Sequence, residues 1–159
     1  MYKRHYRLLI SLMLVLAACK KETATDFVEL DLLSYGMPIV IKAPSDPEIK
    51  TMDLVLSKDI TVTKGKDFNL QIFESDADTR DIGAIKSRLL NEVRNNPYFD
   101  TILADNKAGF IYRSQIDSTY TNYGFRYIRI QSDKEYVFQQ GLRGKFTEAD
   151  VERMYQAVQ

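Results

Sequence analysis

Histidine and cysteine each occur only once in this chain of 159 residues, at His5 and Cys19. Residues 20–159 therefore contain no imidazole and no thiol. This absence excludes Ser-His-Asp and Cys-His nucleophilic mechanisms from that part of the chain, together with disulfide scaffolds and zinc held by histidine or cysteine. Catalysis there would have to use carboxylates, lysine, tyrosine or an ion bound through oxygen.

An apolar stretch occupies residues 8–19 and reads LLISLMLVLAAC. It follows a head of seven residues that contains Lys3, Arg4 and Arg7 and no acidic residue, which is the layout of a secretory signal peptide. The stretch is too short to span roughly 30 Å of hydrocarbon, which needs about 20 apolar residues. The sequence therefore predicts a signal peptide rather than a transmembrane helix.

The end of this stretch, Leu16-Ala17-Ala18-Cys19, resembles the lipobox of bacterial lipoproteins. The resemblance implies that residues 1–18 are removed and that the thiol of Cys19 carries a diacylglycerol, which anchors the protein in a membrane. An ordinary signal peptide that contains a cysteine by chance is the alternative. The lipobox interpretation is favoured because the only cysteine of the chain stands where a lipobox needs it.

A polar tether, residues 19–26, separates the predicted anchor from the first apolar run of the mature chain. The spacer KKETATD reaches at most about 25 Å when extended, so we expect the folded part to lie close to the membrane. Lys20 replaces the aspartate that is associated with inner-membrane retention in some bacterial lipoproteins. The resemblance thus implies an outer-membrane lipoprotein, and the lack of an acidic run after Cys19 favours the periplasmic face.

Removal of the signal peptide takes three of the 22 basic residues and none of the 22 acidic ones, which leaves a net charge near −3. This charge does not favour nucleic acid as a partner. The mature length is sufficient for one compact core, and no internal repeat or interior linker divides it. We expect a single domain over residues 27–159.

Alternating and β-branched segments predict an antiparallel sheet in two blocks. The expected strands are Met37–Ala43, Met52–Leu56, Ile60–Thr63, Phe68–Glu74, Phe99–Ala104, Phe110–Ile116, Phe125–Gln131 and Tyr136–Leu142. The segment Phe27–Leu33 fits either a strand or a short helix. On Phe125–Gln131 both faces are partly apolar, so we expect the sheet to be covered on each side.

Helical spacing predicts two helices, one between the blocks of strands and one at the end of the chain. The first covers Thr79–Asn95 with Asp78 as N-cap, and its buried stripe is Ile82, Ile85, Leu89, Leu90 and Val93. The second is capped by Thr147, with Phe146 as a hydrophobic staple, and its buried residues are Val151, Met154, Tyr155 and Val158.

The order strands, helix, strands, helix predicts an α+β fold with a mainly antiparallel sheet and two principal helices. Tyr35-Gly36 before MPIVIKAP, the helix Thr79–Asn95, and YVFQQGL followed by FTEADVERMYQAV resemble the PsbP-like α-β-α sandwich. This resemblance implies a binding or assembly accessory domain.

Acidic residues suggest two kinds of site, and neither has a complete motif. Glu74, Asp76, Asp78 and Asp81 could attract calcium, but an EF-hand loop starting at Asp76 would need glycine at its sixth position and glutamate at its twelfth. Paired carboxylates for glycoside chemistry have no recognisable context in this sequence. The sequence therefore assigns no catalytic, cofactor-binding or metal-binding residue.

Tyrosine and arginine alternate in one section of the chain, which comprises Tyr112, Arg113, Tyr120, Tyr123, Arg126, Tyr127 and Arg129. Such residues are enriched at protein interfaces, although tyrosine is also a common strand residue. Turn residues over Asp117–Gly124 predict a loop, so Tyr120 and Tyr123 are the candidate contacts with an envelope partner. The sequence thus favours a lipid-anchored, non-catalytic binding domain, with a small-ligand carrier and a carboxylate-based enzyme as alternatives.

Overall fold

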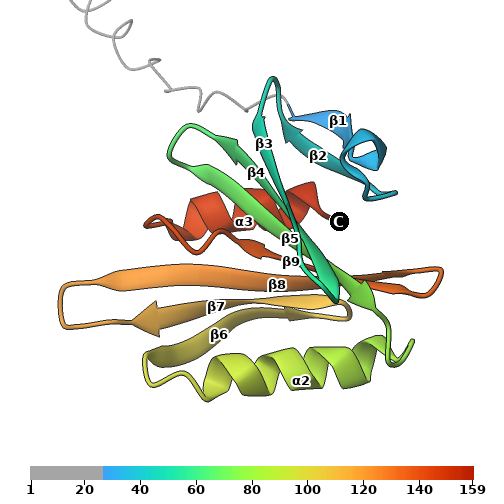
Figure 1. Ribbon diagram of the computed structural model, residues 1–159. Coiled ribbons are helices and arrows are strands. Elements are labelled where there is room, and N and C mark those ends of the chain that lie inside the picture. The colour runs from blue at the N-terminus through green and yellow to red at the C-terminus, as the bar shows by residue number, and fades with distance from the viewer. Residues whose placement is uncertain (1–26) are drawn as a thin grey trace, which may run out of the picture.

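The computed structural model describes residues 27–159. The predicted signal peptide and Cys19 lie outside the described residues. A seven-stranded antiparallel sheet has the order β3-β4-β5-β9-β8-β7-β6, and a small second sheet pairs β1 with β2 (Figure 1). The strands are β1 (Phe27–Asp31), β2 (Val40–Pro44), β3 (Glu48–Asp53), β4 (Ser57–Lys64), β5 (Phe68–Asp76), β6 (Phe99–Asn106), β7 (Gly109–Gln115), β8 (Thr121–Gln131) and β9 (Lys134–Gln140).

Two α-helices pack on the large sheet, α2 (Ile82–Arg94) and α3 (Glu148–Ala157), and a short 3-10 helix, η1 (Leu33–Tyr35), joins β1 to β2. This arrangement confirms the predicted α+β fold with a mainly antiparallel sheet and two principal helices. Neither helix in residues 27–159 has the length and apolar character that crossing a membrane requires.

The two helices cover opposite faces of the sheet, as the alternation on β8 predicts. Phe125 and Tyr127 point to one face and pack edge-on against Tyr155 of α3, with ring centroids 5.7 and 5.8 Å apart. Ile128 and Ile130 point to the other face and join the apolar cluster of α2. Successive residues of a strand face opposite sides, so β8 supports a core on each side of the sheet.

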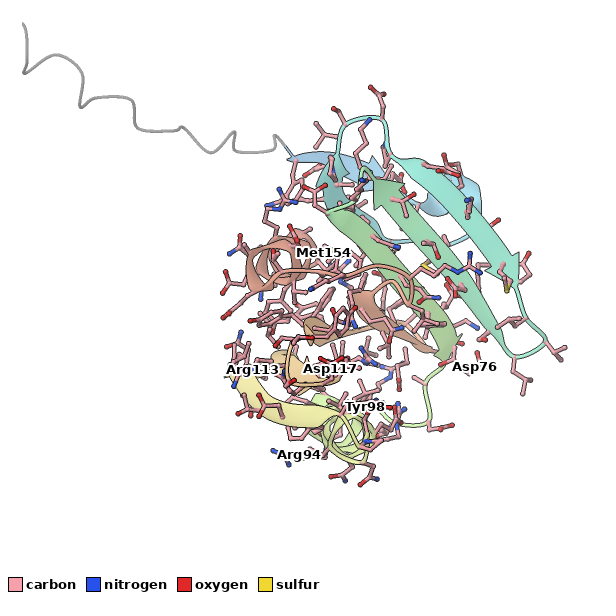
Figure 2. All side chains as sticks on the ribbon, turned by 90° about the vertical axis from the view of Figure 1, so that its left-hand side faces the viewer. Asp76, Arg94, Tyr98, Arg113, Asp117 and Met154 are labelled. Carbon is pink, nitrogen blue, oxygen red and sulfur yellow. The ribbon has the colours of Figure 1, made fainter. Side chains whose placement is uncertain are left out.

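The larger core lies between the sheet, α3 and the β1–β2 hairpin (Figure 2). Phe138 and Ile72 of neighbouring strands are fully buried there. Arg129 extends from β8 and donates hydrogen bonds to the carbonyl oxygens of Val40 and Val158, at 3.0 and 2.9 Å. The hairpin and the end of α3 are thereby joined to the sheet.

The buried stripe of α2 is confirmed, but its predicted N-cap is wrong. Ile85, Leu89, Leu90 and Val93 are buried, whereas Ile82 is only partly buried and packs against the same cluster. The cap is Asp81 and not Asp78, because the Asp81 carboxylate accepts hydrogen bonds from the backbone of Gly83 and Ala84 at 2.8 and 3.2 Å. A carboxylate can cap only from the position next to the first turn, and Asp78 lies too far upstream.

The cap of α3 is confirmed. Thr147 accepts from the backbone N–H of Asp150, and the Asp150 carboxylate accepts from the backbone N–H of Thr147, which completes a capping box. Phe146 and Val151 are both buried in the larger core, where a hydrophobic staple would place them.

The bounds of the predicted strand Met52–Leu56 are wrong, because only Met52 and Asp53 belong to a strand. β3 ends at Asp53, and residues 54–56 form the tip of the β3–β4 hairpin, which the Leu54 N–H closes by donating to the Ser57 carbonyl at 2.8 Å. The apolar run suggested a strand, but burial of Ile60 and Val62 sets the register of β4 and leaves the run beyond the sheet.

Other boundaries follow the predicted pattern with shifts of a few residues. Phe27–Asp31 is a strand that leads into η1, which resolves the ambiguity at this segment. The turn between β4 and β5 is present, and Gly65 adopts a positive φ of 63° in it. β8 begins at Thr121, so the predicted loop Asp117–Gly124 is four residues too long.

Burial of Tyr136 predicts a loss of stability at alkaline pH. Its side chain is buried in the core, and this burial, with the Glu74 carboxylate opposite it on β5, raises the pKa of the hydroxyl to about 12. The unfolded chain loses this proton near pH 10. The protonated hydroxyl of Tyr136 therefore makes its full contribution to the free energy of unfolding below about pH 10. This contribution is lost as the pH rises through about 12.

We expect Tyr136→Phe to flatten the fall in unfolding free energy over this pH window, measured by urea titration at fixed pH. Tyr98→Phe is the matched control, because Tyr98 is exposed and its loss should leave the slope of the wild type unchanged. Equal slopes for Tyr136→Phe and the wild type would contradict the assignment.

Candidate functional site

One half of the sheet face that bears α2 is left without a helix. α2 packs on β6, β7, β8 and β9, whereas β3, β4 and β5 present polar side chains on the same face. On β4, Asp59, Thr61 and Thr63 alternate with Ile60 and Val62, which are buried in the larger core. The uncovered half is therefore a polar surface, and the opposite face of the same strands packs in the larger core.

A row of polar side chains crosses this face from strand to strand. Lys50 of β3, Thr61 of β4, Gln71 of β5, Gln139 of β9 and Arg126 of β8 are direct partners in successive strand pairs. Cross-strand partners project to the same side of a sheet, so the five side chains lie next to one another. We call them the polar row.

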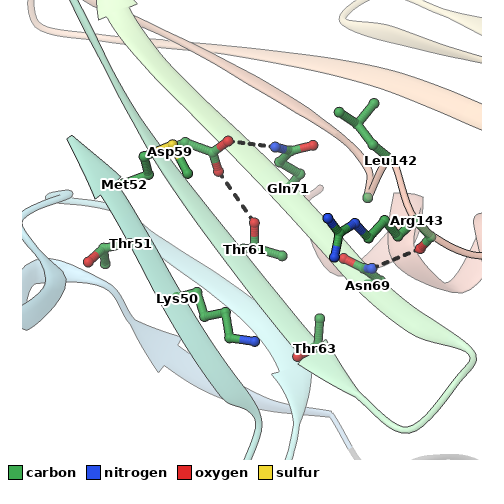
Figure 3. Close-up of a pocket in the computed structure, with 11 residues that line it drawn as sticks. Lys50, Thr51, Met52, Asp59, Thr61, Thr63, Asn69, Gln71, Leu142 and Arg143 are labelled. Atoms are coloured by element: carbon green, nitrogen blue, oxygen red, sulfur yellow. Dashed lines mark hydrogen bonds between the residues drawn. The ribbon is translucent and has the colours of Figure 1, made fainter. Parts of the chain in front are cut away.

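A groove of about 370 Å³ lies along the uncovered half of the sheet (Figure 3). Strands β3, β4 and β5 form its floor, and the segment after β9 forms one wall. Its lining residues are Lys50, Thr51, Met52, Asp59, Thr61, Thr63, Asn69, Gln71, Gly141, Leu142 and Arg143.

Hydrogen bonds fix the polar side chains on the floor. The Asp59 carboxylate is 8% exposed and accepts from Gln71 Nε2 at 2.5 Å and from Thr61 Oγ1 at 3.4 Å. Gln139 Nε2 donates to Gln71 Oε1 at 3.2 Å, which continues the chain along the polar row. A buried network of this kind holds its members in one orientation, so the floor presents a defined pattern of polar groups.

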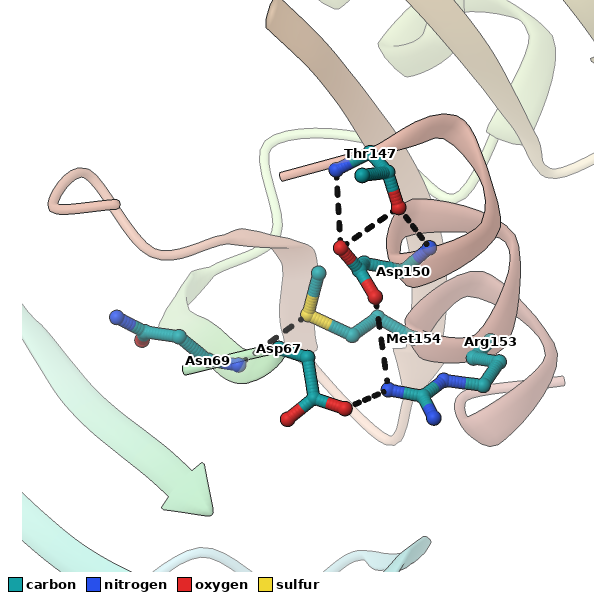
Figure 4. Close-up of polar contacts among 6 residues, drawn as sticks. All are labelled: Asp67, Asn69, Thr147, Asp150, Arg153 and Met154. Atoms are coloured by element: carbon teal, nitrogen blue, oxygen red, sulfur yellow. Dashed lines mark hydrogen bonds and ion pairs between the residues drawn. The ribbon is translucent and has the colours of Figure 1, made fainter. Parts of the chain in front are cut away.

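Asn69 connects the groove to α3. Its Nδ2 donates to the Arg143 carbonyl at 3.1 Å, and its backbone N–H donates to the sulfur of Met154 on α3 at 3.4 Å (Figure 4). Gly141 lies against the Asn69 side chain so closely that a Cβ at this position would come within 2.1 Å of Asn69 Oδ1. This close approach allows the segment after β9 to form the wall.

A second contact holds α3 against the turn before β5. Arg153 of α3 contacts the Asp67 carboxylate at 2.7 Å, and this hydrogen bond lowers the pKa of Asp67 (Figure 4). Both side chains are partly exposed, so this ion pair contributes little to the stability of the domain.

The groove offers hydroxyl, amide, carboxylate and cationic groups to a ligand. Among its lining residues, Asp59 alone carries a carboxylate, whereas Lys50 and Arg143 are cationic. Lys50 is paired with Glu48 at 2.9 Å on the exposed edge strand. Met52 and Leu142 add exposed apolar surface at the rim. Such a lining suits a polar ligand or chain segment that is held by hydrogen bonds with some apolar contact.

The structure separates the two tyrosines that the sequence singles out. Tyr120 lies in the connection before β8, with its ring 4.7 Å from the Nζ of Lys145. Tyr123 is part of β8, opposite Arg113, and packs against the larger core, so its placement in a loop is wrong. The loop prediction is wrong because Asn122 and Gly124, which are common turn residues, both lie within β8. The role of Tyr120 and Tyr123 in binding a partner stays a prediction.

Arginines of the same section are engaged within the domain. Arg113 pairs with Asp100 at 2.5 Å. Arg126 lies 5.7 Å from the ring centroid of Tyr112 and donates to the Tyr112 hydroxyl at 3.4 Å. Gly124 leaves room for this ring, because a Cβ there would come within 2.5 Å of it. These contacts support the interpretation that the tyrosine–arginine pattern serves the packing of the strands and not an interface.

The acidic residues between β5 and α2 are used locally. Asp76 pairs with Lys134 at 2.5 Å, and Asp81 caps α2. In residues 27–159 no group of three or more acidic residues converges in a way that could hold a metal ion.

Sequence reasoning missed the groove residues, although one signal for them was present. Asp59, Thr61 and Thr63 alternate with apolar residues, as do Asn69 and Gln71. That pattern is the ordinary mark of a strand with one solvated face. Only the strand order shows that these faces lie side by side and that α2 does not cover them.

Comparisons of this chain with protein-family models, curated proteins and solved structures find no match.

Proposed function

We propose that this protein is a lipoprotein of the bacterial cell envelope whose non-catalytic domain binds another envelope component. The lipobox of the sequence supports the anchor at Cys19, and the same features favour the outer membrane and its periplasmic face. The observation that carries the binding role is the groove on the uncovered half of the sheet.

The arrangement of the domain supports this proposal over the alternatives. Two helices on opposite faces of an antiparallel sheet agree with the PsbP-like resemblance, which implies a binding or assembly accessory. A carrier of apolar ligands needs an enclosed apolar cavity, whereas the groove is open to solvent and polar side chains such as Asp59, Thr61 and Gln71 form its floor. Hydrolysis by paired carboxylates needs two facing acids, and Asp59 stands alone among the lining residues.

Cross-linking inside cells would test the binding role. A benzophenone amino acid at position 52 lies at the rim of the groove, where Met52 is 59% exposed, so the probe should leave the fold intact. We expect one discrete cross-linked product, which weakens when Lys50 and Arg143 are both replaced by alanine.

The control is the same probe at Tyr98, an exposed position just before β6 and outside the groove. This probe should not give the product. If both probes give the same products, or if Met52 gives none, the groove is not the binding site.

A further inference from the structure

The two most exposed large apolar residues of the described chain, Val55 and Leu56, are at the tip of the β3–β4 hairpin. Leu54, Val55 and Leu56 are 50%, 99% and 88% exposed. They are consecutive and occupy the turn, beyond the last strand pair of Asp53 with Lys58. Single exposed aliphatic residues are common, but three in succession at a protruding vertex mark a contact surface.

We propose that this tip inserts into the same lipid bilayer that holds the Cys19 anchor. The tip is a hairpin turn beyond the last strand pair, and the open depression of about 270 Å³ beside it is also lined by the charged Glu74, Asp76 and Lys134, which does not suit an apolar ligand. The tip is purely aliphatic, without the tryptophan, tyrosine or arginine that anchor protein interfaces. Both properties favour hydrocarbon.

Charges around the tip are suited to the headgroup level of a membrane. Lys58 pairs with Asp53 at 3.5 Å, and Lys134 pairs with Asp76 at 2.5 Å. Asp53 and Asp76 are thus each matched by a lysine, which limits their repulsion from anionic lipid. The aliphatic tip therefore lies next to two paired charges.

The position of the tether permits this contact. The described chain begins at Phe27, which pairs with Pro44 near the start of β3, whereas the tip lies at the other end of that strand (Figure 2). The span from Glu48 to the tip is roughly 25 Å, and the tether, residues 19–26, reaches about as far. The domain can therefore lie with the β3–β4 hairpin along the membrane and with both ends in contact.

The contact of the tip with the bilayer would orient the domain, whereas the lipid anchor would keep it at the membrane. Three partly inserted aliphatic side chains provide weak, reversible attachment, comparable to or weaker than one acyl chain. Combined with the anchor, they limit rotation about the tether. The inference rests on the proposed lipid anchor only for bringing the tip to the bilayer.

A fluorescent label at position 55 would test the insertion. In the full acylated chain the Cys19 thiol is blocked, so Val55→Cys supplies the one free thiol for an environment-sensitive nitrobenzoxadiazole dye. After reconstitution into phosphatidylethanolamine–phosphatidylglycerol vesicles, we expect a blue-shifted emission that is quenched by phospholipid carrying a spin label in its acyl chain. Adding Leu54→Ser with Leu56→Ser should abolish the shift without unfolding the domain, because both side chains are at least half exposed.

The same label at Ser118 is the control. Ser118 is exposed and lies before the first residue of β8, whereas the tip lies beside the opposite end of the sheet. Its emission should match that of the dye in water. An unshifted, unquenched signal at position 55 would overturn the proposal and favour a protein pocket as the occupant.

Failure of the anchor itself would give a different result. An unacylated Cys19 would take up a second dye molecule, and the protein would not stay with the vesicles. That outcome would contradict the proposed function, whereas a single label in anchored protein with no blue shift would contradict only the insertion of the tip.

Discussion

Leu89→Asp is expected to destabilise the domain by about 3–5 kcal/mol, enough to unfold much of it at ambient temperature. Leu89 is 4% exposed and lies in the middle of the α2 stripe, in the cluster with Val93, Phe110 and Ile128. The substitution removes an apolar side chain from this cluster and leaves a carboxylate without a partner. Urea denaturation followed by circular dichroism would measure the loss.

Asn91→Asp is the matched control for this variant. It introduces the same side chain on the same helix, but Asn91 is exposed. A negative charge near the C-terminal end of a helix costs only a few tenths of a kcal/mol to about 1 kcal/mol. If Leu89→Asp melts like Asn91→Asp, the second core on the α2 face does not contribute to stability.

Cys19→Ala is expected to abolish the lipid anchor and remove the protein from the outer membrane. The proposed modification needs the thiol, and cleavage before residue 19 depends on it in lipoproteins of this kind. We expect the variant to accumulate as an uncleaved or mislocalised precursor. Fractionation of cells followed by immunoblotting would measure the loss from the outer-membrane fraction.

Thr23→Ala is the matched control in the tether. It keeps the lipobox and changes one polar residue four positions after the cysteine. This variant should fractionate with the wild type. Retention of Cys19→Ala in the outer membrane at the wild-type level would show that the protein is held there by another means.

Local sequence patterns correctly predicted the parts of the fold that depend only on the burial of apolar side chains within one helix or strand. The stripes on α2 and α3 depend only on helical spacing and burial, and both were predicted correctly. The alternation on Phe125–Gln131 correctly predicted a core on each side of the sheet, because apolar residues on both faces of a strand need two partners.

Predictions failed where distant residues decide the structure. The run Leu54-Val55-Leu56 is apolar like a buried strand, yet it forms a turn because the buried side chains of β4 set the register of the hairpin. Tyr123 was assigned to a loop because its neighbours are turn residues, whereas pairing with Arg113 on β7 extends the strand. Propensity is a weak guide where cross-strand pairing competes with it.

The groove could not be predicted, because it depends on strand order. Gln71 and Gln139 are 68 positions apart, and they meet only because β5 pairs with β9. Equally, no local pattern shows that α2 covers β6–β9 and leaves β3–β5 open. A binding site assembled from such separated segments becomes visible only in the folded chain.

The mass of the mature N-terminus tests the central claim most directly. The protein would be extracted from the membrane fraction of cells that produce the full chain, and its N-terminal peptide analysed by mass spectrometry. The proposal predicts a chain that begins at Cys19 and carries a diacylglycerol on its sulfur. A peptide with an unmodified Cys19, or a chain that still begins at Met1, would contradict the claim that this domain is a lipid-anchored component of the envelope.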